Sequence, residues 1–321
     1  MYALVFDRVG EAQDVLALRD LPSPVPAAGQ VLLAVDASPI HPADLAFIRG
    51  AYRVKPRCPQ VAGLSGAGRV VRAGDGVALR PGTRVAFRAP GAWSQFAIAP
   101  VDRVYEVPPQ FNIEAAAELP LNPITAWGLL ASARVRRGDF IGLTAAASSV
   151  ATLVGILARE RGVHVVGIAR EGGPPLPGPH EHAITDTTPQ LAARVRELTG
   201  GMGLTALLDC VGGPLLEALF PALAPAATVV AYGTLSPDAI AVRNATLVYG
   251  NLTLFGFGID HFLAGLSPAA HQRMLSRLWA GIAGGRLPLP VRRRVSLREF
   301  PRGLALARER EPGKVHFAPE P

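Results

Sequence analysis

The chain has 321 residues, of which 49% are hydrophobic and 18% charged, and a formal net charge of +7. This length suffices for two domains, and the two cysteines, Cys58 and Cys210, exclude a disulfide framework and a cysteine-rich metal cluster, so we expect a cytoplasmic protein. The positive charge comes almost entirely from arginines that are spread along the chain without interleaved aromatic residues, which argues against nucleic-acid binding as the main function.

The first 120 residues alternate short β patterns with glycine and proline. The start, residues 1–7, reads as a strand and not as a signal peptide, because no basic segment precedes the apolar residues. Five strands are predicted, over residues 2–6, 30–37, 68–73, 83–87 and 94–98. Many short strands with frequent turns indicate a compact, β-rich, barrel-like domain.

From Asn122 the pattern changes to alternating helices and strands. We predict helices over 125–133, 149–161, 189–199 and 215–222, and strands over 139–144, 163–169, 204–210, 228–232 and 246–257. Such alternation is typical of a parallel sheet with helices on both faces. A helix over about 268–284 follows, and then a short basic tail that ends at residues 313–317.

The segment 139–158 carries the strongest signal, a buried strand, five small residues and the start of an apolar helix. Small side chains let backbone N–H groups approach a pyrophosphate, and a helix N-terminus favours its negative charge. Here Ala146, Ser148, Ser149 and Val150 are the expected contacts, although the turn is not a G-x-G-x-x-G. A membrane span over 140–158 is a poor alternative, because the small residues interrupt it. A strand–turn–helix without a ligand remains open.

Arg170 follows the next strand, at the position where an acidic residue would favour NAD and a cation would favour NADP. The sequence therefore predicts NADPH as the cofactor. The neighbouring acidic residue, Glu171, weakens this prediction of NADPH.

Several segments together resemble a known family. They are Ser38-Pro-Ile-His-Pro-Ala-Asp-Leu45, Ile48-Arg-Gly-Ala-Tyr52, Gly63-Leu-Ser-Gly-Ala-Gly68, Leu121-Asn-Pro-Ile-Thr-Ala-Trp127, the 145–151 turn and Leu208-Asp-Cys-Val-Gly-Gly213. From end to end the chain resembles the medium-chain dehydrogenase/reductase superfamily, in its zinc-independent quinone oxidoreductase-like branch, and most of all the NADPH-dependent trans-2-enoyl-CoA reductases.

The resemblance implies an α/β fold of two domains. Residues 1–121 and 263–321 would form a GroES-like, β-rich catalytic domain, and residues 122–262 a Rossmann domain with a doubly wound parallel sheet that binds NADPH. The active site would lie in the cleft between the domains. The resemblance also implies a homodimer joined through the nucleotide-binding domains. We expect no membrane or nucleic-acid partner, because small residues interrupt the apolar segment 140–158 and the arginines are spread along the chain.

Three residues are candidates for catalysis. Tyr52 matches the tyrosine that enoyl reductases use near the substrate carbonyl, where a phenol can stabilise an enolate or help to protonate the α-carbon; alternatively it braces its loop. Arg53 follows it where the family usually has glycine. His41 either faces the nicotinamide or packs locally. Asp44 either positions the Tyr52 loop or caps the helix that starts near Ala43.

Further candidates for cofactor binding come from the second half of the chain. The resemblance places Asn122 and Thr125 near the nicotinamide amide, although both could simply begin a helix. Tyr232 and Gly233 end a sheet strand, where ligands sit in such folds. Phe255 and Phe257 could line the site, or they could simply pack in the core. Lys314 could contact a cofactor phosphate, or it could be an ordinary surface charge.

Zinc can be tested at the positions of the ligands in zinc-dependent relatives. His41 stands where these relatives have cysteine, and Gly63-Leu64-Ser65 stands where they have Gly-His-Glu. One imidazole without further ligands cannot hold a catalytic zinc, which needs three protein ligands. The four-cysteine lobe is also missing, so we predict no metal.

The resulting prediction is a zinc-independent NADPH-dependent oxidoreductase that reduces an activated C=C bond, in a 2-enoyl thioester or an enone, by hydride transfer to the β-carbon. Cations near Tyr52, namely Arg49, Arg53, Lys55 and Arg57, suggest attraction of coenzyme A or carrier-protein phosphates. An NADPH:quinone oxidoreductase is the enzymatic alternative. A non-catalytic NADPH-binding scaffold or sensor is the alternative from another class.

Overall fold

The computed structural model describes residues 1–174, 176, 178, 180–309 and 311–319. The chain divides into two compact units: unit 1 is Met1–Leu121 with Leu289–Pro321, and unit 2 is Asn122–Pro288. Residues 263–288 therefore group with unit 2 by their contacts, whereas the resemblance implies a domain boundary at 262/263. That boundary stays a prediction.

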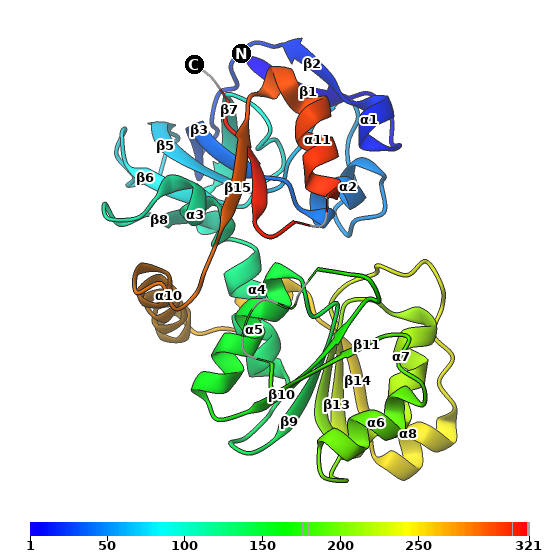
Figure 1. The fold of residues 1–321 in the computed structure, drawn as a ribbon. Helices are drawn as coiled ribbons and strands as arrows, with labels where there is room; N and C mark the ends of the chain where they lie inside the picture. The colour runs from blue at the N-terminus through cyan, green and yellow to red at the C-terminus, as the bar shows by residue number, and fades with distance from the viewer. Residues whose placement is uncertain (175, 177, 179, 310, 320–321) are drawn as a thin grey trace. The chain divides into compact units, whose positions relative to one another are not determined.

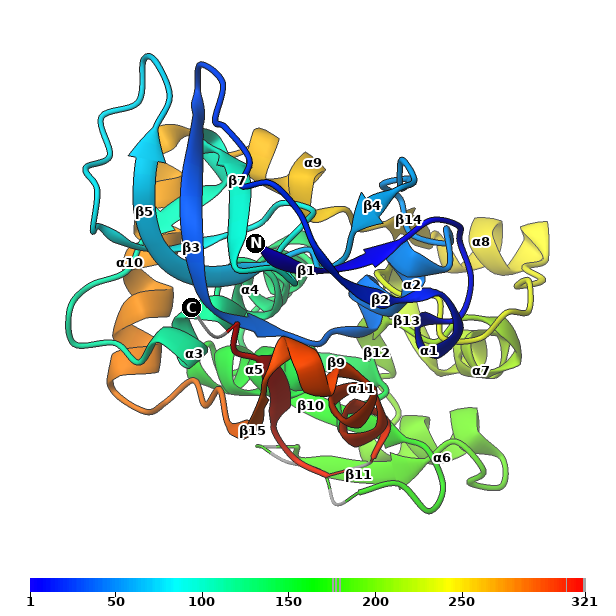
Figure 2. The same ribbon diagram turned by 90° about the horizontal axis from the view of Figure 1, so that it is seen from above.

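Unit 1 is built on two sheets, which are antiparallel except for the parallel pair β15 and β16 in the larger one. The smaller has the order β2-β1-β4, from β1 (Tyr2–Phe6), β2 (Ala17–Asp20) and β4 (Gln60–Val61). The larger has the order β15-β16-β3-β5-β6-β8, with β7 (Phe96–Pro100) also paired to β3. Its other strands are β3 (Gln30–Pro39), β5 (Gly66–Ala73), β6 (Arg84–Phe87), β8 (Val104–Glu106), β15 (Val291–Val295) and β16 (Lys314–Phe317). In Figure 2 the long strand β3 runs between β5 and β7.

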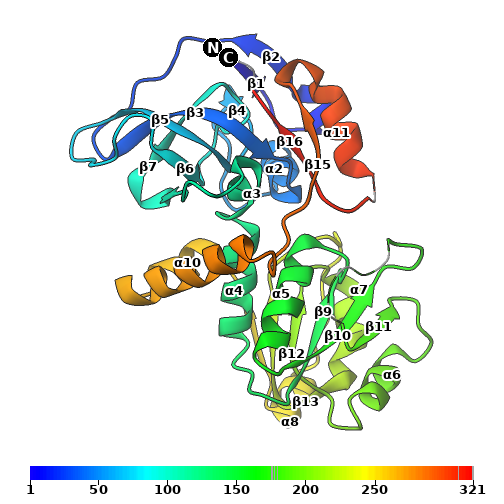
Figure 3. The ribbon, with the colours of Figure 1, turned by 60° about the vertical axis from the view of Figure 1, so that its left-hand side comes forward.

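The C-terminal segment is not the plain tail that the sequence suggested. It forms β15, the 3-10 turn Leu297–Glu299, α11 (Phe300–Arg308) and β16, which pairs with the end of β3. Figure 3 shows α11 beside these strands. Val295, Leu304 and Phe317 are buried in one core cluster with Phe6 and Trp93. This burial joins the two ends of the chain in unit 1.

Short helices complete unit 1. They are α1 (Ala12–Val15), α2 (Pro42–Ile48), α3 (Ile113–Glu118) and the 3-10 turn Val101–Arg103. Asn112 begins α3, because its side-chain oxygen accepts hydrogen bonds from the backbone N–H groups of Glu114 and Ala115 at 2.7 and 3.4 Å. Such a cap satisfies donors that have no partner within the helix.

Unit 2 is a parallel six-stranded sheet with the order β11-β10-β9-β12-β13-β14. Its strands are β9 (Phe140–Thr144), β10 (His164–Ala169), β11 (His182–Thr185), β12 (Leu204–Asp209), β13 (Leu223–Ala231) and β14 (Thr253–Gly256). Its helices are α4 (Asn122–Ser132), α5 (Ser149–Glu160), α6 (Leu191–Leu198), α7 (Gly213–Leu219) with the 3-10 turn Phe220–Ala222, α8 (Asn244–Gly250), α9 (Ile259–Ala264) and α10 (Pro268–Ala283). Figure 1 shows α4 and α5 on one face of the sheet and α6 and α7 on the other. This confirms the predicted fold class, a GroES-like β-rich part and a doubly wound parallel sheet.

One predicted strand of unit 2 is wrong. Residues 246–257 form the helix α8 followed by the strand β14, and not one strand. The two are separated at Asn251, whose left-handed backbone (φ of 49°) ends the helix. The strand β11, at the opposite edge of the sheet, was not predicted at all.

In the part of the chain that the structure describes, no helix combines the length and apolar character needed to cross a bilayer.

Candidate cofactor and active site

The turn after β9 has the geometry of a phosphate-binding turn. Ala145 adopts a left-handed backbone (φ of 47°), so the chain reverses within a few residues. Ser148 then caps α5, because its hydroxyl oxygen accepts a hydrogen bond from the Ala151 N–H at 3.2 Å. Ser149 and Val150 form the first turn of α5, where N–H groups have no partner earlier in the helix. These groups are free to receive an anion.

A buried network fixes the same edge of the sheet. The Thr144 hydroxyl donates to Asp209 Oδ1 at 2.6 Å and accepts from the Cys210 N–H at 2.9 Å. The Asp209 carboxylate also accepts from the N–H groups of Val211 and Gly212, at 3.2 and 2.8 Å. The network joins the carboxyl ends of β9 and β12, the two strands between which the chain reverses its direction through the sheet. Ligands of doubly wound sheets bind at such a switch point.

Arg170 lies exposed directly after β10. Its guanidinium makes no hydrogen bond or ion pair with the described residues. Glu171 is held elsewhere, because its backbone N–H donates to Asp186 and its carboxylate accepts from the Thr187 hydroxyl at 2.7 Å. The competing acidic residue is thus occupied, which leaves Arg170 available to an anion.

Tyr232 and Gly233 follow β13 at the same edge of the sheet. A side chain at Gly233 would place its Cβ 2.6 Å from the Cys210 carbonyl oxygen, so only glycine fits this close approach. The Tyr232 hydroxyl is buried without a hydrogen bond in the described structure. Burial raises the pKa of Tyr232 well above its ordinary value, so the phenol stays neutral.

The other cofactor candidates are more scattered. Asn122 and Thr125 lie in the first turn of α4, and Phe255 lies in β14. Phe257 packs against Gly128 and the Phe262 ring, whose centroid is 5.7 Å away. Lys314 belongs to unit 1, in β16. Roles of these residues toward a cofactor stay predictions.

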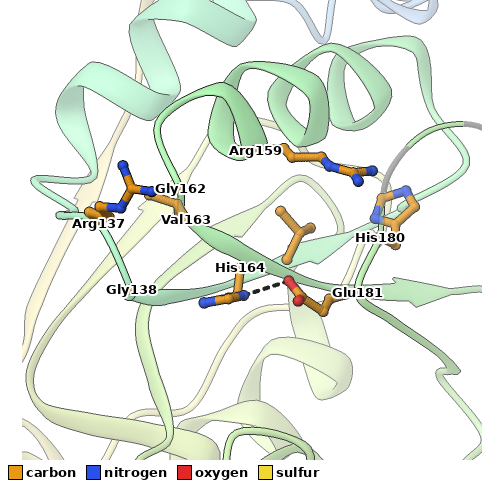
Figure 4. Close-up of a pocket in the computed structure, with 9 residues that line it drawn as sticks. Arg137, Gly138, Arg159, Gly162, Val163, His164, His180 and Glu181 are labelled. Atoms are coloured by element: carbon orange, nitrogen blue, oxygen red, sulfur yellow. Dashed lines mark hydrogen bonds and ion pairs between the residues drawn. The ribbon is translucent and has the colours of Figure 1, made fainter.

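Unit 2 also contains a hollow of about 510 Å³ at the amino end of its strands (Figure 4). Arg137, Arg159 and His180 line it, together with His164, whose Nδ1 is 2.6 Å from Glu181 Oε2. His164 is the first residue of β10, so this hollow lies at the opposite ends of the strands from the Ala145 turn. It is therefore not part of the cofactor site described above.

In unit 1, His41 lies in a buried cluster that sequence reasoning missed. Its Nε2 is 4.0 Å from Glu118 Oε2, and His316 Nε2 is 3.2 Å from Glu118 Oε1. Burial lowers the pKa of His41 to about 4, so the imidazole is neutral at pH 7. Burial opposes ionisation of Glu118, but the two imidazoles outweigh it and hold the Glu118 pKa at about 2. The sequence did contain one signal for Glu118, because it is a single acidic residue in the apolar run Ala115-Ala116-Ala117-Glu118-Leu119.

Asp44 is fully buried at the start of α2. Its Oδ2 accepts from the His41 N–H at 2.7 Å, and its Oδ1 accepts from the Leu64 N–H at 2.8 Å. The first bond supports the helix-cap interpretation, while the second ties α2 to the segment before β5. Burial raises the pKa of Asp44 to about 7, although both N–H donors favour the carboxylate.

Tyr52 lies at the edge of a second hollow, within unit 1. Its backbone N–H donates to the Ala46 carbonyl at 3.1 Å, which holds it close to the end of α2, and its ring lies under the Arg53 guanidinium at 5.4 Å. The ring is half-buried and packs against the core cluster that contains Phe47. Both interpretations of Tyr52, as a brace and as a hydrogen-bond donor beside a cavity, are compatible with this position.

The residues of unit 1 do not fit a catalytic zinc. His41 and Glu118 are buried together, but Leu64 offers an apolar side chain and Ser65 a hydroxyl where further ligands are needed. Among the described residues no three His, Cys, Asp or Glu side chains are grouped as metal ligands. We therefore derive no step through a metal.

Comparison with known proteins agrees with this geometry. A family model described as "Alcohol dehydrogenase GroES-like domain" matches residues 27–109, and one described as "Zinc-binding dehydrogenase" matches residues 149–266. The bovine (Bos taurus) mitochondrial enoyl-[acyl-carrier-protein] reductase is 29% identical over 315 residues, which cover 93% of this chain and 83% of that protein. The chain belongs to the medium-chain dehydrogenase/reductase superfamily.

Two solved mycobacterial structures cover 99% of this chain and all of their own, each at 27% identity. One is a complex with NADPH, with a TM-score of 0.89, and the other is named a quinone oxidoreductase, with a TM-score of 0.85. The protein is thus an oxidoreductase of this superfamily, in the branch of quinone oxidoreductases and enoyl reductases, with a nicotinamide dinucleotide as its cofactor.

Proposed function

We propose that the protein is a zinc-independent, NADPH-dependent reductase of activated C=C bonds, in a 2-enoyl thioester or an enone. The observation that carries this proposal is Tyr52, a phenol at the edge of a hollow in the catalytic unit. The relative named an enoyl reductase supports the substrate class, because an enoyl group contains a C=C bond conjugated to a carbonyl.

NADPH rather than NADH is proposed because of Arg170. Its guanidinium follows β10 and pairs with none of the described residues, and a planar guanidinium is well suited to bind a phosphate through two hydrogen bonds. The Ala145 turn and the first N–H groups of α5 would receive the pyrophosphate. Gly233 lets the chain after β13 pass close to Cys210 at the same edge of the sheet.

NADPH, held by the Ala145 turn and Arg170, would supply a hydride to the β-carbon of the substrate, and negative charge would then develop on the carbonyl oxygen. The Tyr52 hydroxyl is proposed to donate a hydrogen bond to that oxygen, after which the α-carbon takes up a proton. His41, neutral and buried beside Glu118, is proposed to keep the loop before α2 in place rather than to transfer a proton.

The test is NADPH oxidation by the purified protein with crotonyl-CoA. Tyr52→Phe should lower kcat by about 10-fold or more, because it removes one donor to a developing negative charge. Tyr2→Phe is the matched control, since Tyr2 is an exposed tyrosine of the same unit. Equal kcat for Tyr52→Phe and wild type would remove Tyr52 from the mechanism.

An NADPH:quinone oxidoreductase is the second candidate, favoured by the mycobacterial relative with that name. Turnover of naphthoquinone but not of crotonyl-CoA would establish it. NADPH binding without turnover of either acceptor would instead indicate a non-catalytic scaffold or sensor.

We also propose a homodimer formed through unit 2. The strand β14 is an edge of the sheet, and an edge strand offers unpaired backbone groups to a second copy. The preceding helix α8 exposes Val248 and Tyr249, at 71% and 87% of their surface. Apolar residues this exposed next to an open edge are suited to an interface.

A further inference from the structure

The hollow beside Tyr52 has an unusual lining for an apolar pocket. It measures about 60 Å³, and three arginines border it, namely Arg53, Arg88 and Arg103. The other described residues that line it are apolar or neutral: Tyr52, Val54, Leu64, Ser65, Ala89, Pro90 and Leu121. No aspartate or glutamate is among these described residues, so the lining supplies cationic groups and no carboxylate.

Two polar groups of this lining have no partner. The Arg103 side chain makes no hydrogen bond or ion pair with the described residues. The Ser65 hydroxyl is buried, at 1% exposure of the residue, and also makes no hydrogen bond in the described part of the chain. Buried polar groups are nearly always satisfied, so unsatisfied ones at a hollow indicate a ligand or water.

The arginines are held in place by the backbone. The Arg88 N–H donates to the Arg103 carbonyl oxygen at 3.1 Å, which puts these two residues side by side after β6 and before β8. Arg88 is only 7% exposed. Both residues therefore border the hollow from fixed backbone positions.

Most of the cations that the sequence places near Tyr52 do not line this hollow. Arg49 pairs with Glu11 at 3.6 Å, and Lys55 Nζ donates to the Gly50 carbonyl at 2.8 Å. Arg57 is not part of the lining. The positive charge beside Tyr52 therefore comes from Arg88 and Arg103, which are distant from Tyr52 in the sequence, together with Arg53.

On the basis of the proposed function, we propose that this hollow binds a carboxylate of the substrate, so that the enzyme selects activated alkenes that carry a carboxylate close to the double bond. The size of the hollow suits a group of a few heavy atoms. Arg103 and the Ser65 hydroxyl are the donors to this carboxylate. A guanidinium matches the planar geometry of a carboxylate.

The experiment compares two alkenes that differ by one charge. Monomethyl fumarate carries a carboxylate, and dimethyl fumarate is its neutral diester with the same double bond. The wild type should show a kcat/KM for the monoester that exceeds that for the diester by about 10-fold or more, since a charge-assisted hydrogen bond is typically worth this much. Arg103→Gln should abolish this preference, because it should lower kcat/KM for the monoester far more than for the diester.

Controls separate this inference from the function on which it rests. Arg57→Gln removes an exposed cation outside the hollow and should retain the preference, and Ser65→Ala should reduce it in part. A wild-type preference for the diester, or an equal loss for both alkenes in Arg103→Gln, would overturn the carboxylate proposal while leaving C=C reduction intact. Reduction of neither alkene would count against the proposed function.

A binding measurement keeps the proposal testable without turnover. Monomethyl succinate, the saturated analogue, should bind to the NADPH-loaded protein in calorimetry, and its Kd should rise about 10-fold or more in Arg103→Gln. The unfolding midpoint of each variant shows that it is folded. Absence of binding to the loaded wild type, or an equal Kd in Arg103→Gln, would refute the carboxylate site.

Discussion

Replacing Thr144 with valine should destabilise unit 2 strongly although it preserves the shape of the side chain. The Thr144 hydroxyl is fully buried, and it both donates to Asp209 and accepts from the Cys210 N–H. Losing the acceptor leaves a buried N–H without a partner, at about 1–3 kcal/mol, and losing the donor removes a hydrogen bond to a carboxylate, at about 1.5–3 kcal/mol. The expected loss is therefore about 2.5–6 kcal/mol.

Urea unfolding, followed by circular dichroism and by tryptophan fluorescence, measures this loss. Unit 2 contributes Trp127 and Trp279 to the fluorescence, and unit 1 contributes Trp93. The two units are expected to unfold in separate steps, so the transition of unit 2 must be fitted by itself. Thr205→Val, on the same strand as Asp209, is the control, and it should change stability by less than about 0.5 kcal/mol.

Thr144→Ser provides the rescue, because serine retains the hydroxyl and loses only a methyl group. It should recover most of the stability, together with NADPH affinity, since the same network shapes the edge of the sheet that receives the cofactor. A loss for Thr144→Val no larger than that of Thr205→Val would show that water or a backbone shift satisfies the Cys210 N–H, and our assignment of the network would be refuted.

Three further predictions concern the cofactor, the buried histidine and the edge of the sheet. Arg170→Gln should raise the KM for NADPH by about 10-fold and leave the KM for NADH unchanged. Arg136→Gln, at the other end of the strands, is the control. Equal changes for both cofactors would contradict the phosphate contact. His41 has a lowered pKa, of about 4, so its contribution to stability is fully present above about pH 6.5 and is lost as pH falls toward 4. His41→Gln should remove about 3 kcal/mol of that acid sensitivity in urea titrations from pH 7 to pH 4, and an unchanged pH profile would argue against a neutral imidazole. Tyr249→Arg should convert the dimer to a monomer in light scattering with unit 2 still folded, whereas a dimer that persists would place the interface elsewhere.

Local signals in the sequence were enough to predict the secondary structure of the central part of unit 2. The strand β9, the small residues of the turn and the helix α5 were predicted to within one residue at each boundary, because each carries its own pattern and Ser148 is a strong cap. The strand β1 was predicted with its observed limits, Tyr2–Phe6, for the same reason.

The failures share a physical cause, which is the influence of distant parts of the chain. Thr246, Val248 and Tyr249 favour a strand by propensity, yet they form α8 and remain partly or largely exposed, so a continuous β-prone run was misleading. In the same way, β16 depends on strands that are distant in the sequence or not predicted, because it pairs with β3 and with β15.

The candidate active site could also be predicted only in part from local sequence. Tyr52, His41 and Asp44 were found by resemblance, but the groups that define their surroundings are not close to them in sequence. Glu118 reaches His41 from α3, and Arg103 reaches the hollow beside Tyr52 from the turn before β8. No local pattern could have brought these residues together, because only the sheet of unit 1 does so.

The net charge of the chain takes on a meaning once the partners of individual arginines are known. Many arginines pair with acidic residues on the same unit, as Arg19 does with Asp7 and Arg286 with Glu160, and such exposed pairs contribute little to stability. Arg170 and Arg103 differ, because neither has an acidic partner among the described residues. A guanidinium binds a phosphate or a carboxylate through paired hydrogen bonds, and we therefore propose that Arg170 selects the cofactor and Arg103 the substrate.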